Sequence, residues 1–355
     1  MESVVELNLK FYKNRNVLIT GHTGFKGTWL SRILIDAGAN VTGYALEPSE
    51  KTNLFDISGI QSQMRSIIGD IRDCKQLNKV FDECQPEIVL HLAAQPLVRL
   101  SYIKPRYTYE TNVMGTVNVC EGVRLHPCVK SFLNVTTDKV YKNNEWDWGY
   151  RENEPLDGYD PYSNSKSCSE LVTHSYINSF FNDMGINVST ARAGNVIGGG
   201  DFSQDRIIPD CFRAVVNKEK IIVRNPYSVR PYQHVFEPLM VYLLIAAKQF
   251  EDSKYCGYYN VGPNEYDCVT TGQLVELFCQ KWGDGCEWTH ADSTGPHEAN
   301  FLKLDCSKIK NTFHWQPVWN VEQMMEKTVE WYKTYLNHLD IKACMDNQIK
   351  SFFKL

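Results

Sequence analysis

The chain has 355 residues, which is enough for one large domain or two closely packed ones with a substantial core. Hydrophobic residues make up 43% and charged residues 22%, as in ordinary globular proteins, so disordered and fibrous classes are excluded. The formal net charge of −5, without a long basic run, predicts that neither nucleic acid nor an anionic membrane surface is a partner.

The twelve cysteines do not form a disulfide framework or a metal-binding pattern. They are scattered from Cys74 to Cys344 without any Cys-x-x-Cys spacing, so we predict reduced thiols and no metal site. The first residues lack the basic and apolar regions of a secretory signal. The longest apolar stretch, residues 239–247, is too short to span a bilayer. We therefore predict a cytoplasmic protein.

Short β-branched runs alternate with longer amphipathic stretches through the first half of the chain. Residues 17–19 form the first predicted strand, followed by a glycine-rich loop and a helical pattern over 28–36. The other predicted strands are residues 40–44, 65–68, 87–92, 131–135 and 187–192. Strands that alternate with helices favour right-handed βαβ crossovers, so we predict an α/β fold of the Rossmann type with a doubly wound parallel sheet.

The loop between the first strand and the first helix contains Gly21, Gly24 and Gly27. Glycines at this spacing permit a tight turn, close approach of the backbone to a pyrophosphate, and close packing of the helix against the strand. The N-terminus of the following helix offers free N–H groups to phosphate. The strand–loop–helix context therefore predicts that this loop binds a dinucleotide.

An acidic residue about 20 positions further on usually holds the adenosine ribose. Glu47 fits that count but follows the end of the second predicted strand, where it could equally be a solvated surface carboxylate. Asp70, at the end of the third predicted strand, is the better candidate for contacting the adenosine. The residues alone leave the choice between NAD and NADP open.

Tyr162 and Lys166 lie one helical turn apart, so a phenol and an ammonium share one face. A nearby cation lowers the pKa of a phenol, which can then act as a base near neutral pH. The pattern alone is weak evidence, because roughly one such match is expected by chance among the 19 tyrosines. Thr137, which follows the fifth predicted strand, could share a hydrogen bond with Tyr162.

The alternation of strands and helices breaks down beyond about residue 195, where glycine- and proline-containing loops separate short segments. We predict a dinucleotide-binding domain over residues 1–195 and a smaller α/β substrate lobe over 196–355, with segments that cross between the two. Ligands of open parallel sheets bind beyond the carboxyl ends of the strands, so this lobe is expected to cover that edge.

Taken together, these features resemble an extended short-chain dehydrogenase/reductase over essentially the whole chain. The resemblance rests on the glycine loop, His91-Leu92-Ala93-Ala94, Asn112, Thr137 and the Tyr162/Lys166 pair. Sugar-nucleotide dehydratases typically carry Thr-Asp-Glu after the fifth strand. The Thr137-Asp138-Lys139 of this chain instead resembles the CDP-glucose 4,6-dehydratases. Other stretches that resemble this subfamily are residues 94–99, 159–162, 193–201 and 230–235.

The resemblance implies NAD as cofactor and a nucleotide-sugar as substrate. The implied catalytic residues are Thr137, Asp138, Lys139, Tyr162 and Lys166. The implied cofactor contacts, besides Tyr162 and Lys166, are Gly21, Thr23, Gly24, Phe25, Lys26, Gly27, Asp70, Ile71, Leu92, Ala93, Ala94 and Arg192. The implied substrate contacts are Gln95, Asn195, Arg206 and Arg230. Many related dehydratases carry an arginine after a His-Asp pair, whereas this chain has His297-Glu298-Ala299, which removes one possible phosphate contact.

The implied reaction is a dehydration without net redox change. Tyr162 takes the proton of the sugar's C4 hydroxyl, Thr137 orients that oxygen, and Asp138 protonates the departing C6 hydroxyl. Lys139 is the expected C5 base, which requires a lowered pKa; it could instead pair with Asp138 or bind substrate. The alternatives are a dTDP- or GDP-hexose dehydratase, an epimerase of the same fold, and, more distantly, a non-enzymatic NAD-binding scaffold. Family resemblance also implies a homodimer or homotetramer.

Overall fold

The structure is a computed structural model that describes residues 7–290 and 302–354. His297-Glu298-Ala299 lies outside the described residues. All twelve cysteines are free thiols, as predicted. Every helix in the described part of the chain is either too short or too polar to serve as a membrane span.

A seven-stranded sheet forms the centre of the molecule, and all of its pairings are parallel. Its strand order is β11-β6-β5-β4-β1-β2-β3, so the predicted Rossmann-type fold is confirmed. The strands are β1 Asn16–Thr20, β2 Asn40–Ala45, β3 Arg65–Ile68, β4 Ile88–His91, β5 Ser131–Val135, β6 Asn187–Ala193 and β11 Tyr258–Val261. The six predicted strands lie within two residues of their expected bounds, whereas β11 was not predicted. The order reverses between β1 and β4, which places a ligand crevice at their carboxyl ends.

Helices cover both faces of the sheet, because alternate strand residues point to opposite sides. In β1, Val17 and Ile19 join one core cluster and Leu18 joins the other. The first cluster includes α1 (Phe25–Asp36) and α10 (Phe236–Glu251). The second is covered by α3 (Cys74–Cys84), α6 (Gly115–Leu125) and the end of α7 (Pro161–Tyr176). The helix α1 begins three residues earlier than predicted, because the glycine loop itself supplies its first turn.

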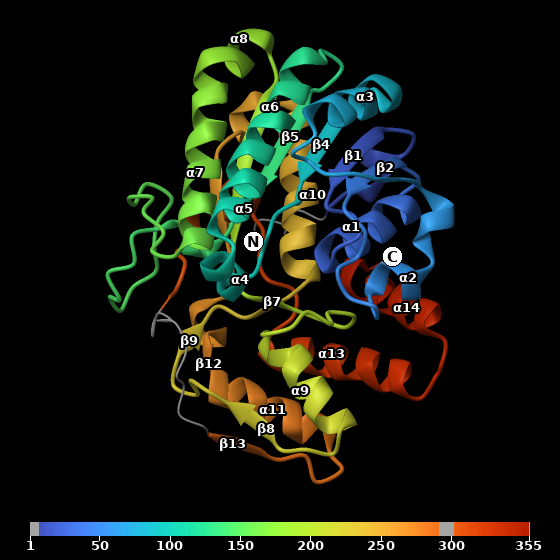
Figure 1. Ribbon diagram of the computed structural model, residues 1–355, viewed down its shortest axis with the longest axis vertical. Helices are drawn as coiled ribbons and strands as arrows, with labels where there is room; N and C mark the ends of the chain where they lie inside the picture. Colours follow the sequence, from blue (N-terminus) through green and yellow to red (C-terminus); the bar gives the residue numbers. More distant parts are fainter. Residues whose placement is uncertain (1–6, 291–301, 355) are drawn as a thin grey trace.

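A smaller lobe lies beyond the carboxyl edge of the sheet (Figure 1). Its three two-stranded sheets pair β7 (Val196–Ile197) with β10 (Gln233–His234), β9 (Val229–Arg230) with β12 (Val269–Thr270), and β8 (Ile221–Val223) with β13 (Trp288–His290). Its helices are α9 (Ile207–Val216), α11 (Thr271–Trp282) and α13 (Val321–Leu336). The chain returns to the large sheet in α10 and β11. The remaining helices are α2 Leu54–Ser58, α4 Val98–Ile103, α5 Pro105–Tyr109, α8 Asn182–Met184, α12 Ser307–Phe313 and α14 Ile341–Phe353.

Glu237 connects α10 to the segment that precedes α13. Its side chain is buried, and Oε1 accepts hydrogen bonds from the backbone N–H groups of Val318 (2.9 Å) and Trp319 (2.7 Å). Burial raises the pKa of Glu237 to about 8, although the two N–H groups oppose the shift. The carboxyl group is therefore protonated in the folded protein at neutral pH, whereas it ionises near pH 4.3 in an unfolded chain.

This difference predicts that Glu237→Gln stabilises the protein increasingly as the pH rises. A carboxyl group with a raised folded pKa contributes stability below its unfolded pKa and has lost it above its folded pKa. The glutamine oxygen can accept the same two hydrogen bonds without titrating. The free energy of unfolding of Glu237→Gln minus that of the parent should rise by at most about 1.4 kcal/mol per pH unit between about pH 5 and pH 8, then level off. Urea unfolding across this range measures the difference. Glu251→Gln, at the exposed end of α10, is the control, and an equal effect of both substitutions would contradict the assignment.

Candidate active site

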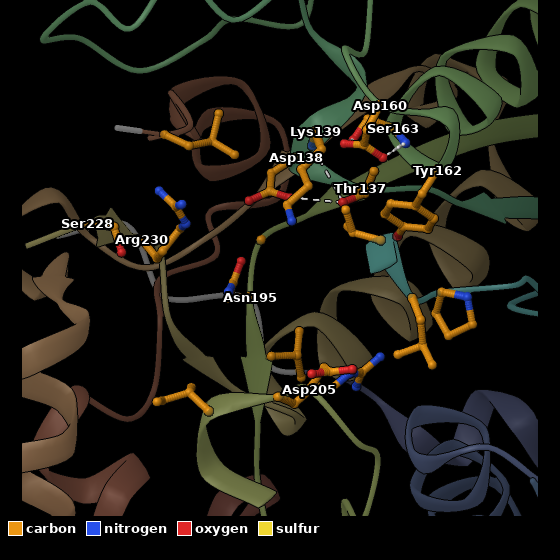
Figure 2. Close-up of a pocket in the computed structure, with 18 of the residues that line it drawn as sticks. Thr137, Asp138, Lys139, Asp160, Tyr162, Ser163, Asn195, Asp205, Ser228 and Arg230 are labelled. Atoms are coloured by element: carbon orange, nitrogen blue, oxygen red, sulfur yellow. Dashed lines mark hydrogen bonds between the residues drawn. The ribbon is translucent and has the colours of Figure 1, made fainter. Parts of the chain in front are cut away.

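A cavity of about 940 Å³ lies between the carboxyl edge of the large sheet and the smaller lobe. Its lining comes from the segments after β5 and β6, the start of α7, and the smaller lobe (Figure 2). Residues 136–139 and Tyr162 line one side. Arg230 and Ser228 of the smaller lobe lie on another side, and Asn195 and Asp205 also line the cavity (Figure 2). Four of the five predicted catalytic residues, Thr137, Asp138, Lys139 and Tyr162, therefore line one cavity, whereas Lys166 is buried and does not line it.

The glycine loop approaches the sheet closely on one side and is open on the other. Gly21 has φ +83°, and a Cβ there would lie 2.8 Å from the backbone nitrogen of Ala93. A Cβ on Gly27 would lie 2.0 Å from the carbonyl oxygen of Gly21. Gly24, by contrast, is exposed and begins α1 without a side-chain cap, and the first turn of α1 has no acidic residue. The first N–H groups of the helix are thus open to an anion, which fits the pyrophosphate of a dinucleotide.

The two residues between Gly24 and Gly27 have different surroundings. Phe25 packs against the core cluster of α1 and α10. Lys26 lines the cavity, and burial lowers the pKa of its ammonium to about 7, assisted by the positive charges of Arg206 and Lys166. The negative charges of Asp138 and Asp201 oppose this shift. Lys26 therefore places a partly compensated cation between the glycine loop and the predicted catalytic segment.

The predicted adenosine-binding side of the loop lies at the ends of β2 and β3. Asp70 forms hydrogen bonds with Arg72, at 2.7 Å for Nη2 to Oδ2, and Arg72 lowers its pKa although burial acts in the opposite direction. Ile71 is buried in the second core cluster. Thr23 is buried and donates to the carbonyl oxygen of Leu46 at 2.8 Å, which fixes the loop against the end of β2. Glu47 is exposed at that end.

The end of β4 runs alongside the glycine loop. The backbone nitrogens of Leu92 and Ala93 donate to Thr20 at the end of β1, through its carbonyl oxygen at 3.1 Å and its hydroxyl at 3.3 Å. Ala94 follows in the same segment and is partly buried. Gln95 is turned away from the cavity: its side chain is buried and bonds the backbone of Leu97 and the hydroxyl of Thr108. Residues 96–99 line the cavity in its place.

Thr137, Asp138 and Lys139 begin a short turn of 3-10 helix directly after β5. Thr137 donates a hydrogen bond to Oδ1 of Asp138 at 2.9 Å, as Figure 2 shows. Asp138 is only 2% exposed, and its Oδ2 has no hydrogen-bond partner among the described residues. Burial raises the pKa of Asp138, although Lys139, Thr137 and Arg230 oppose the shift. A carboxyl group with a raised pKa is better suited to donate a proton than an ordinary one.

Tyr162 and Lys166 lie on the first turns of α7, whose N-terminus is capped by Asp160. The hydroxyl group of Thr137 lies close enough to that of Tyr162 to influence its titration. Burial raises the pKa of Tyr162 to about 12, and the Thr137 hydroxyl and the charge of Arg206 act against this shift. Lys166 donates to the carbonyl oxygen of Val135 at 3.1 Å, and burial lowers its pKa to about 8. The sequence predicted that Lys166 lowers the phenol pKa, but in this structure the opposing cation at Tyr162 is Arg206.

The predicted substrate residues Asn195, Arg206 and Arg230 all line the cavity. Arg206 forms an ion pair with the buried Asp201 at 3.0 Å, and Asp201 raises its pKa. Sequence reasoning gave Asp201 no role, because nothing in its spacing reveals its partner.

A second ion cluster at the cavity wall was also not predicted. Asp205 contacts Arg99 of α4 at 3.3 Å and Arg224 at 3.6 Å, and all three line the cavity. Arg99 belongs to the large-sheet domain and Arg224 follows β8 in the smaller lobe, so Asp205 links the two.

Arg192 is not at the cavity surface. It lies on β6 with a side chain that is 3% exposed, and its guanidinium forms an ion pair with Glu170 of α7 at 2.9 Å. It also donates to the hydroxyl of Tyr141 at 2.9 Å and to the carbonyl oxygen of Glu152 at 3.0 Å. The structure thus places this predicted cofactor contact behind α7.

Comparisons with known proteins agree with this fold. The family model described as GDP-mannose 4,6 dehydratase matches residues 18–328. The CDP-glucose 4,6-dehydratase of Salmonella typhimurium is 46% identical, over 98% of both chains. The dTDP-glucose 4,6-dehydratase of Haemophilus influenzae is 25% identical, over 89% of this chain and 97% of its own.

Two solved structures show the same fold. The dTDP-glucose 4,6-dehydratase of Bacillus anthracis, in complex with NAD, has a TM-score of 0.77 and 22% identity, over 92% of this chain and 98% of that one. The UDP-glucose 4-epimerase of Thermotoga maritima, with UDP-glucose, has a TM-score of 0.80 and 23% identity, over 90% of this chain and 99% of that one. From the family match and the 46% identity, the chain belongs to the GDP-mannose 4,6 dehydratase family.

Proposed function

We propose that the protein is a CDP-glucose 4,6-dehydratase, which converts CDP-glucose into CDP-4-keto-6-deoxyglucose and water with NAD as a bound cofactor. The observation that carries the proposal is the placement of Thr137, Asp138 and Lys139 beside Tyr162 in one enclosed cavity. The 46% identity to a CDP-glucose 4,6-dehydratase supports the choice of substrate. An epimerase of this fold would not need an acid and a base beside Thr137.

The residues present fit a dinucleotide at the glycine loop, because α1 begins with open N–H groups and Gly21 and Gly27 leave no room for a Cβ. We propose that Asp70 and Ile71 hold the adenosine side and that Tyr162 and Lys166 hold the nicotinamide side. When bound, NAD would supply a reversible two-electron oxidation. C4 of the sugar is oxidised first, and C6 is reduced afterwards. The protein's own side chains then have only protons to move.

Tyr162 removes the proton of the C4 hydroxyl, while Thr137 orients the C4 oxygen. Once C4 is a ketone, the C5 proton is acidic, and Lys139 removes it. Asp138 donates a proton to the C6 hydroxyl, which leaves as water. C6 gains a hydrogen in place of its hydroxyl, and C5 takes a proton back from the protonated Lys139, so the sugar loses one water and no cofactor is consumed overall.

We propose that the substrate diphosphate lies near Asn195, Arg206 and Arg230, because arginine recognises phosphate through paired hydrogen bonds. The division into a cofactor domain, residues 1–195, and a substrate lobe, residues 196–355, belongs to the same proposal. It is supported by the cavity between them, with α10 and β11 as the segments that cross back.

Product identification tests the function. Purified protein is incubated separately with CDP-, dTDP- and GDP-hexoses and trace NAD, and the 4-keto product is detected by its near-ultraviolet absorbance in alkali. We expect many turnovers per NAD with CDP-glucose and much lower rates with the other two. A C4 epimer without loss of water would indicate an epimerase, and no conversion of any substrate would indicate a scaffold.

We also propose a homodimer formed through the outer helices of the large domain, with a homotetramer as the alternative. Large apolar side chains are exposed on the helical segments from α5 to α8: Tyr109, Met114, Leu125, Leu171, Phe180 and Met184. The segments that carry these side chains pack against one another, and exposed apolar side chains on neighbouring helices suit an association surface. Light scattering during size-exclusion chromatography should give twice the mass of the chain, and a single-chain mass would reject the proposal.

A further inference from the structure

Glu170 and Arg192 form a buried ion pair directly behind the catalytic face of α7. Their side chains are 1% and 3% exposed. Glu170 follows Lys166 by four residues, as Lys166 follows Tyr162, so the three side chains lie along one side of the helix. A buried charge pair is costly unless further hydrogen bonds satisfy it, so its presence here calls for a reason beyond stability.

The carboxylate of Glu170 joins three elements. Its Oε1 accepts a hydrogen bond from the hydroxyl of Thr136, the residue before Thr137. Its Oε2 accepts from the hydroxyl of Thr190 on β6 at 2.7 Å and from Arg192 at 2.9 Å. Glu170 therefore fixes the segment after β5 relative to both α7 and β6. The connection lies one residue before Thr137 and two helical turns after Tyr162.

Arg192 is held in turn by groups on the far side of the pair. Besides Glu170, it donates to Tyr141 and to the backbone of Glu152. The Tyr141 hydroxyl donates to the side-chain oxygen of Asn260 on β11. Because its side chain is buried and both terminal nitrogens bond protein groups, Arg192 supports Glu170 rather than contacting a ligand.

Glu170 also acts electrostatically on Lys166. Burial disfavours an ammonium, and the pKa of Lys166 is lowered to about 8, with Glu170 as the opposing charge. The other titratable groups that interact with Lys166 are His91 at the end of β4 and Lys26 of α1, and its own helix adds Tyr162. None of these three is negatively charged at neutral pH. Within the described residues, the stabilising charge on Lys166 thus comes from Glu170.

We infer that Glu170 is a positioning residue: anchored by Arg192, it holds the Thr136–Thr137 segment against α7 and keeps Lys166 in its ammonium form. This inference rests on the proposed function only for the meaning of Lys166 in the reaction. The placement of Glu170 and its effect on Lys166 are properties of the protein alone and can be measured without substrate.

The test compares Glu170→Gln with the parent protein, both as purified full-length chains. The pH dependence of Lys166 acetylation by acetic anhydride, read by peptide mass spectrometry, gives the titration midpoint of Lys166. We expect the midpoint to fall by about one pH unit in Glu170→Gln, because an opposite charge has been removed. The alkaline limb of kcat/KM for CDP-glucose should move in the same direction, and Glu170→Asp, which keeps the charge, should restore much of the shift.

Glu170→Gln leaves Arg192 buried without a counter-charge, so a second variant guards against misfolding. Glu170→Gln/Arg192→Met removes both charges and should show the same fall in the Lys166 midpoint. The control is Arg32→Met/Asp346→Asn, which removes a less buried ion pair (2.6 Å) between α1 and α14. It should leave the titration midpoint of Lys166 unchanged. An unchanged midpoint in both Glu170 variants would overturn the inference. A lowered midpoint in a protein that does not convert CDP-glucose would reject the function and keep the inference.

Discussion

Replacing Tyr162 with phenylalanine should reduce the rate of CDP-glucose dehydration by about 10²- to 10⁴-fold, the usual contribution of a positioned acid or base. The substitution removes one oxygen atom and keeps the ring that fills this part of the cavity. Without that oxygen, the proposed acceptor of the C4 proton is gone, whereas the Thr137 hydroxyl keeps its hydrogen bond to Asp138. Because every later step depends on oxidation at C4, exchange of the C5 hydrogen with deuterium oxide should also stop.

The pH dependence gives this prediction a second measurement. Burial raises the pKa of Tyr162 to about 12 in this structure. The parent enzyme should therefore become faster as the pH rises, until loss of the ammonium form of Lys166 reverses the trend near pH 8. Tyr162→Phe should lose the rising part of this profile.

Tyr227→Phe is the control for Tyr162→Phe, because Tyr227 is 81% exposed and does not line the cavity. It should leave the rate and its pH profile unchanged. A Tyr162→Phe protein that retains a tenth or more of the parent rate would show that another group takes the C4 proton.

The strands of the large sheet were predictable because they are short runs of apolar and β-branched residues with helices on both sides. β5 and β3 have their predicted bounds. β11 escaped prediction because it is four residues long and has Asn260 at its third position, a residue type that strands disfavour. Asn260 is held there by hydrogen bonds to the backbone of Tyr150 (2.7 Å) and Asp305 (3.1 Å), which are remote in sequence.

The residues proposed for the site also divide into those whose placement could be predicted from the sequence and those whose placement could not. Thr137, Asp138 and Tyr162 could be predicted because their order along the chain, after β5 and at the start of α7, is itself the signal. Gln95 lies in a matching stretch and Arg192 ends a predicted strand, but their side chains bond partners that no spacing reveals. The role of a side chain that points away from the cavity depends on tertiary contacts, so only the structure could separate these two groups.

Asp138→Asn should reduce dehydration by about 10²-fold or more while exchange of the C5 hydrogen continues. The substitution is nearly isosteric, and the amide oxygen can still accept the hydrogen bond of Thr137. An amide cannot, however, donate the proton that the departing C6 oxygen needs. The sugar is then oxidised at C4 and loses its C5 proton, but the C6 hydroxyl stays. CDP-glucose recovered from deuterium oxide should carry deuterium at C5, as mass spectrometry would show.

Lys139→Met separates the two adjacent roles, because it removes the expected base and leaves the acid. In this variant both C5 exchange and dehydration should be lost, whereas Asp138→Asn loses dehydration alone. If Lys139→Met exchanged C5 at the parent rate, another group would be the base, and Lys139 would serve to pair with Asp138, which already senses its charge. If Asp138→Asn blocked exchange as well, the carboxyl group would act before the C6 oxygen leaves. The contrast between two neighbouring side chains therefore assigns each proton to its own residue.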